Sequence, residues 1–81
     1  MKELHLVIAS PEQTVFEGKV DMAVLPGELG EFQVLVNHAP LISSLTAGEV
    51  RYTAGKESHS LSIKGGFVEV RDNQISVCAE L

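Results

Sequence analysis

Tryptophan is absent from this 81-residue chain, cysteine occurs once, and aromatic residues make up only 5% of it. The single cysteine, Cys78, cannot form an internal disulfide, so the sequence indicates a reducing compartment and a small buried residue in the last strand. No apolar run reaches the roughly twenty residues that span a bilayer. Met1-Lys2-Glu3 is followed at once by an alternating segment, which is not the pattern of a secretory signal. We therefore expect a soluble protein that meets a membrane only through another protein.

Basic residues are also few. Six Lys and Arg residues stand against eleven Asp and Glu residues, which gives a net charge of −5. Nucleic acids and anionic membranes are bound by basic surfaces, so neither is an expected partner. A protein with basic loops would suit this chain better.

What the chain has in quantity is apolar residues, 44% of the sequence, that alternate with polar ones. This period is typical of β-strands, and no helix of ten residues is expected. Leu41–Leu45 also fits one turn of helix, but its length favours a strand. The sequence predicts an all-β fold, an antiparallel β-sandwich or flattened barrel of about eight to ten short strands, as a single domain over residues 1–81. The expected strands are 4–9, 14–17, 20–24, 31–36, 41–45, 49–53, 58–63, 67–71 and 75–79.

Glycine, proline and asparagine mark the expected turns. Gly18 should end the second strand, and Pro26-Gly27 should turn the chain after the third, whose apolar side we expect to consist of Val20, Met22 and Val24. Further along, Gly55-Lys56 and Asp72-Asn73 predict two hairpins, and Gly65-Gly66 predicts a bulge or a close approach of backbones.

The sequence raises three kinds of chemical site. Gly27, Gly30 and Lys64-Gly65-Gly66 lack the continuation that cradles phosphate, so no nucleotide site is predicted. The three histidines, His5, His38 and His59, are scattered and predict no metal site. Asp21, Glu28 and Glu31 could approach one another across a loop, which leaves a carboxylate hydrolase open, although such loop carboxylates are usually only solvated. We predict no catalytic residue, no cofactor and no metal.

The segment His38-Ala39-Pro40 predicts a rigid corner. The residue before a proline is pushed out of the helical region, which holds the imidazole near a loop rim. Two interpretations remain for His38. Its ring could hydrogen-bond locally to hold the corner, or it could contact a partner.

The order of motifs from Pro26-Gly27 through Gly30, Phe32 and Asn37-His38-Ala39-Pro40 to Gly65–Val70 resembles the epsilon subunit of F-type ATP synthases. The opening segments Val7–Glu12 and Phe16–Gly18 are also similar to the start of that family, so the resemblance covers nearly the whole chain. The helical hairpin that usually follows this β-sandwich in the family is absent from the sequence, and we therefore do not expect hairpin-mediated inhibition of ATP hydrolysis.

The resemblance implies a non-catalytic rotor subunit of the central stalk. Such a subunit links the gamma subunit to the membrane c-ring and couples proton translocation to ATP synthesis at the cytoplasmic face of the inner (plasma) membrane. It implies that Glu28 and Glu31 face the polar loops of the c-ring, and that Ser10 and His38-Ala39-Pro40 face gamma.

A small β-sandwich module that binds a peptide or a sugar is the alternative. Such modules usually expose aromatic side chains on one face or groove. This chain has three Phe and one Tyr, most of them at positions expected to point inward.

Overall fold

The computed structural model describes residues 2–81, which form nine β-strands and contain no helix. The predicted all-β fold is therefore confirmed, including the strand at residues 41–45. Within the same range no helix is long and apolar enough to cross a membrane. The strands are β1 Leu4–Ala9, β2 Thr14–Val20, β3 Met22–Gly27, β4 Gly30–Val34, β5 Leu41–Leu45, β6 Gly48–Ala54, β7 Glu57–Ile63, β8 Gly65–Arg71 and β9 Gln74–Glu80.

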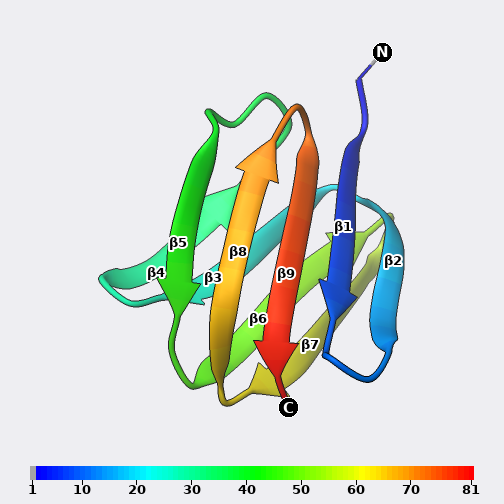
Figure 1. Cartoon of the computed structure of the whole chain (residues 1–81). Coiled ribbons are helices and arrows are strands. Elements are labelled where there is room, and N and C mark those ends of the chain that lie inside the picture. The colour runs from blue at the N-terminus through cyan, green and yellow to red at the C-terminus, as the bar shows by residue number, and fades with distance from the viewer. Residues whose placement is uncertain (1) are drawn as a thin grey trace.

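The nine strands form one continuous sheet that curls into two layers. The strand order is β2-β1-β9-β8-β5-β3-β6-β7, and β4 pairs with β3 outside this path. In Figure 1 the layer of β5, β8, β9 and β1 lies in front, and β3, β4, β6 and β7 lie behind it. The bend between the layers falls where β5 meets β3, which share only the pair Gly27–Leu45. The core lies between the layers.

Alternation along the strands decides which side chains enter this core. Leu4, Leu6 and Ile8 of β1 are completely buried, as their spacing predicts, and Ile75 and Val77 of β9 alternate in the same way. Tyr52 of β6 packs against Phe16 of β2, with ring centroids 4.5 Å apart. This aromatic pair lies where the two layers meet along the β2 side, so it closes the core there.

One strand pair departs from the expected antiparallel arrangement. β1 and β9 run parallel, with Leu6 opposite Ile75 and Ile8 opposite Val77. Parallel neighbours need a long connection, and here the connection is the whole chain between them. A pattern of alternation gives no information on strand direction, which is why the sequence did not indicate this pair.

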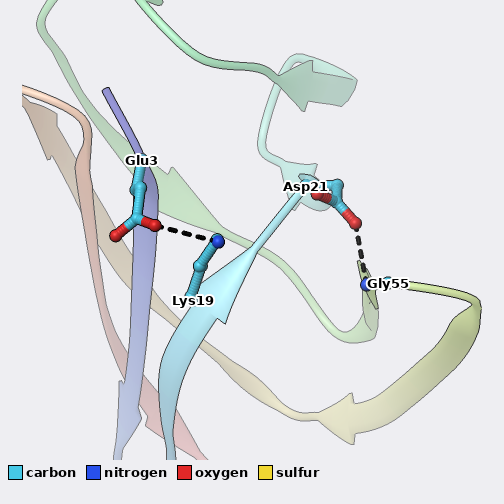
Figure 2. A network of polar contacts seen from close by, with 4 residues as sticks. All are labelled: Glu3, Lys19, Asp21 and Gly55. Atoms are coloured by element: carbon cyan, nitrogen blue, oxygen red, sulfur yellow. Dashed lines mark hydrogen bonds and ion pairs between the residues drawn. The ribbon is translucent and has the colours of Figure 1, made fainter. Parts of the chain in front are cut away.

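The expected turn at Gly18 is wrong, because β2 continues through Gly18 to Val20, with Gly18 opposite Leu6. The chain changes layer at Asp21 instead. Asp21 Oδ2 accepts a hydrogen bond of 2.8 Å from the backbone N–H of Gly55 (Figure 2). The Asp21 N–H also donates to Thr53 O. These contacts attach the β2–β3 connection to the β6–β7 hairpin.

The break at Asp21 also changes which side of β3 is buried. Met22 and Val24 are half-buried, whereas Ala23 and Leu25 are completely buried. The expectation that Val20, Met22 and Val24 form one apolar side is therefore wrong. Asp21, between β2 and β3, interrupts the alternation. The inward side chains are at even-numbered positions in β2 and begin at odd-numbered positions in β3.

The β3–β4 turn lies two residues later than expected. Pro26 and Gly27 are buried strand residues, and the turn consists of Glu28 and Leu29, with Gly27 opposite Gly30. Gly27 is needed there because a Cβ would lie 2.9 Å from the ring of Phe32. Strand β4 then ends at Val34, so the expected extension to residue 36 is wrong as well.

The two hairpins predicted at Gly55-Lys56 and Asp72-Asn73 are confirmed, and the latter two residues have φ of 51° and 62°. The close approach predicted at Gly65-Gly66 is also confirmed, since a Cβ on Gly66 would overlap the Cys78 carbonyl oxygen.

The position expected for Cys78 is wrong. Its side chain is exposed on the outer face of β9, because Val77 and Ala79 take the inward positions.

Candidate partner-contact surface

Glu28 lies with Leu29 at the tip of the β3–β4 hairpin, which projects beside the end of β5 (Figure 1). Two backbone hydrogen bonds fix its base: Glu28 N–H donates to Ser44 O over 3.1 Å, and Thr46 N–H donates to Pro26 O over 2.9 Å. Both tip side chains are exposed. The tip is therefore a protruding turn, fixed at its base, that exposes one carboxylate and one apolar side chain.

Glu31 lies on the same hairpin but has a partner within the chain. Its Oε1 is 3.0 Å from Nη2 of Arg51 on β6, and both side chains are about half-exposed. This pair partly neutralises Glu31, so Glu28 is the freer of the two carboxylates for a basic partner.

Of the three carboxylates that could have formed an acid/base pair, two have separate partners. Asp21 accepts from Gly55, Glu31 pairs with Arg51, and Glu28 lies at the hairpin tip. Over residues 2–81 there is also no group of three His, Cys, Asp or Glu side chains placed to hold a metal ion. Asp21 and Glu31 are thus each bonded to a partner of their own.

The His38 corner lies in the loop between β4 and β5. His38 Nδ1 is 2.7 Å from the carbonyl oxygen of Ala39, and the His38 N–H donates to Leu35 O over 3.1 Å. A carbonyl only accepts, so the proton of this bond is on Nδ1, and Nε2 is directed away from it. The interpretation that the ring hydrogen-bonds locally is confirmed, and it leaves Nε2 available to a partner.

Ser10 follows β1 and organises the β1–β2 turn. Its hydroxyl oxygen lies 3.3 Å from the N–H groups of Glu12 and Gln13, and its own N–H donates to Gln13 O. Because β1 and β5 run in the same direction, Ser10 after β1 and Pro40 before β5 lie at opposite ends of the front layer (Figure 1). The residues assigned to gamma do not form one cluster.

The outer face of the front layer connects these two ends. An open groove of about 450 Å³ at the Ser10 end is lined by Pro11, Phe67 and Cys78 among others. A second hollow of about 330 Å³ lies at the other end, beside Pro40 and Ile42. Both ends therefore border one continuous surface.

Sequence reasoning missed the apolar side chains of this surface. Phe67 is 56% exposed and Ile42 is 76% exposed. Their signal was present in the alternation, because buried Val68 and Val70 imply an outward Phe67. It was overlooked because aromatic residues were expected inside.

Three comparisons bear on this fold. The family model described as "ATP synthase, Delta/Epsilon chain, beta-sandwich domain" matches residues 3–81. A protein of Nitratidesulfovibrio vulgaris named "ATP synthase epsilon chain" is 46% identical over 79 residues, which are 98% of this chain and 59% of that protein. The chain spans about three-fifths of the length of the curated relatives it matches.

Two solved structures share the architecture. A chain of the Euglena gracilis mitochondrial ATP synthase (OSCP/F1/c-ring) matches with a TM-score of 0.88 and 20% identity, over 95% of this chain and 50% of its own. A chain from the central stalk/c-ring structure of the Tetrahymena thermophila mitochondrial ATP synthase matches with a TM-score of 0.81 and 14% identity, over 99% of this chain and 65% of its own. At these identities the likeness is one of fold. Together with the family match over residues 3–81, it confirms the resemblance read from the sequence: the chain belongs to the family of the ATP synthase delta/epsilon chain β-sandwich domain.

Proposed function

We propose that this chain, as a single β-sandwich domain over residues 1–81, is a non-catalytic subunit of the rotor of an F-type ATP synthase. It connects the gamma subunit to the c-ring, so that proton-driven rotation of the ring turns the central stalk and supports ATP synthesis. It works without a cofactor, as a peripheral subunit at the cytoplasmic face of the inner (plasma) membrane. The observation that carries this proposal is the family match over residues 3–81.

Two regions of the surface suit two partners. The β3–β4 tip offers Glu28 and, beside it, Glu31 to basic loops of the c-ring. Exposed ion pairs contribute only about 0.2–1 kcal/mol each, so several contacts must act together.

The outer face of the front layer, bordered by Ser10 at one end and by His38-Ala39-Pro40 at the other, suits gamma. It exposes Phe67 and Ile42, and burial of apolar area contributes roughly 25 cal/mol per Å². Apolar burial on this face therefore supplies more affinity than the carboxylates can.

Co-purification of the tagged chain with gamma from the same source tests the first contact. We expect a one-to-one complex that His38→Asp weakens, because a new negative charge replaces the free Nε2 edge at the corner. Ser58→Asp is the matched control, since it adds the same charge at an exposed position of β7 in the other layer. A folded wild-type chain that forms no complex with gamma would refute the proposal.

For the c-ring contact we expect Glu28→Lys to weaken binding to c-rings in detergent more than Glu31→Gln does. Glu28 is at the exposed tip, whereas Glu31 already pairs with Arg51. Equal binding by wild type and Glu28→Lys at low salt would contradict this assignment.

One observation favours the second candidate function, a peptide- or sugar-binding module. The groove of about 450 Å³ beside Phe67 has a mainly apolar lining. It contains a single aromatic side chain, however, whereas sugar-binding faces usually stack ligands on several. A thermal-shift screen with sugars and short peptides separates the two functions, because the rotor function predicts no response.

A further inference from the structure

Two asparagines join the His38 corner to the neighbouring β8–β9 hairpin. The N–H of Asn37 donates to Asn73 Oδ1 over 2.6 Å, and Asn73 Nδ2 donates to Asn37 Oδ1 over 3.3 Å. Asn37 directly precedes His38, and Asn73 is the second residue of the β8–β9 turn. The contact spans 36 residues of sequence and lies just beyond the end of the β5–β8 ladder, whose last pair on this side is Leu41–Val70.

Asn73 is attached to the rest of the sandwich more firmly than Asn37. It lies between two paired strands, and its carbonyl accepts a hydrogen bond of 2.9 Å from the N–H of His5 at the start of β1. Its φ of 62° suits the tight turn that Asp72-Asn73 forms. One residue therefore joins β1, the β8–β9 turn and the β4–β5 loop.

The β4–β5 loop needs such an attachment. Residues 35–40 lie outside the strands, and Asn37 takes a φ of 67°, which few residues other than glycine adopt at low cost. The bond from His38 N–H to Leu35 O shapes the loop but does not fix it to either layer. The Asn37–Asn73 pair supplies the fixed point one residue before His38.

We propose that Asn73 is a positioning residue, which holds the His38 corner in one preformed conformation through its side-chain bonds to Asn37. The consequence for a partner rests on the proposed function: a corner that is already ordered does not lose conformational freedom when gamma binds. Asn73 itself does not have to touch the partner.

Three single variants of this chain separate the side-chain contact from the turn. Asn73→Gly removes both bonds to Asn37 but keeps a residue that accepts positive φ, and it leaves the carbonyl that His5 uses. Asn73→Asp keeps an oxygen that accepts from Asn37 N–H but loses the donor. Asp72→Gly is the matched control, because Asp72 has a φ of 51° in the same turn and an exposed side chain whose Oδ2 lies 3.8 Å from Nε of Arg71.

Amide hydrogen exchange at Asn37 and His38, measured by NMR, is the first readout. We expect Asn73→Gly to accelerate exchange at both amides by roughly fivefold or more, the loss expected for one hydrogen bond. Asp72→Gly should leave both rates within about twofold of wild type, and Asn73→Asp should lie between. Unchanged rates in Asn73→Gly, or equal acceleration in Asp72→Gly, would overturn the proposal.

Affinity for gamma is the second readout. We expect Asn73→Gly to weaken it by roughly threefold to fivefold at an unchanged melting temperature, and Asp72→Gly to leave it unchanged. If exchange accelerates while affinity stays the same, the preformed corner does not serve binding, and that part of the inference fails. If the wild-type chain binds no gamma, the proposed function fails, while the exchange rates still decide whether Asn73 positions the corner.

Discussion

Among the glycines of residues 2–81, Gly66 is the one whose replacement by alanine should destabilise the fold most. It lies in β8 with a φ of 142°, which L side chains rarely adopt. A Cβ at this position would overlap the carbonyl oxygen of Cys78 on β9 and lie 3.0 Å from the Cα of Ala79. Both obstacles are backbone atoms, so no side-chain rotation can relieve them.

The expected cost follows from these two effects. A side chain held at an unfavourable φ costs about 1–3 kcal/mol, and overpacking adds about 1–3 kcal/mol. Gly66→Ala should therefore lose about 2–6 kcal/mol, against a total stability of roughly 5 kcal/mol for a domain of this size. With a urea m-value of about 1 kcal/mol per molar, the unfolding midpoint falls by at least about 2 M.

Two other glycines provide matched controls in the same urea titration. Gly65→Ala places its Cβ 3.6 Å from Leu45 O, an ordinary contact, and should change stability by less than about 0.5 kcal/mol. Gly30→Ala has a φ of 131° and open space around the Cβ, so it should show the backbone strain alone, about 1–3 kcal/mol. A Gly66→Ala variant as stable as Gly65→Ala would refute this reasoning.

Three further predictions concern side chains. Lys19 lies 2.9 Å from Glu3 and lowers the pKa of that carboxyl below its ordinary value of 4.5 (Figure 2), so Lys19→Met should raise the pKa of Glu3 in a carboxyl NMR titration. Because folding lowers this pKa, the Lys19–Glu3 pair stabilises the fold above pH 4.5, and this contribution is lost as the pH falls through the lowered pKa. A stability difference between wild type and Lys19→Met that persists below this pH range would contradict the prediction. Cys78 should react with a maleimide in the native protein without any denaturant, and protection until unfolding would show that it is buried. Tyr52→Ala should cost about 3–5 kcal/mol in a urea titration, because it removes a buried ring that packs on Phe16, and a cost below 1 kcal/mol would show that this contact does not close the core.

The sequence predicted what depends on local alternation. The inward positions of Leu4, Leu6 and Ile8 and the hairpin at Asp72-Asn73 followed from period and turn chemistry alone. The errors occur where a contact between residues distant in the sequence determines the local structure. Asp21 leaves its strand because it bonds to Gly55, and this reverses the expected faces of β3.

The candidate site was predicted in part for a related reason. The resemblance indicated Glu28 and His38, which the structure places at an exposed tip and at a held corner. It did not indicate that Glu31 pairs with Arg51, or that Phe67 and Ile42 face outward between the two ends. These facts depend on which strands are neighbours, and a local sequence pattern does not show which strands pair.

The parallel pair of β1 and β9 constrains how this protein is made. β1 leaves the ribosome well before residues 74–78, the later of its two partners to be synthesised, so its second edge stays uncovered until they emerge. Closing a loop of that length has a large entropic cost, and folds dominated by such distant contacts fold in milliseconds to seconds. During synthesis an unpaired β1 edge is exposed next to apolar side chains, the condition in which nascent strands associate with one another. Shielding of the nascent chain therefore matters most just before β9 emerges, and any interruption of translation before that point releases a sheet with an open edge.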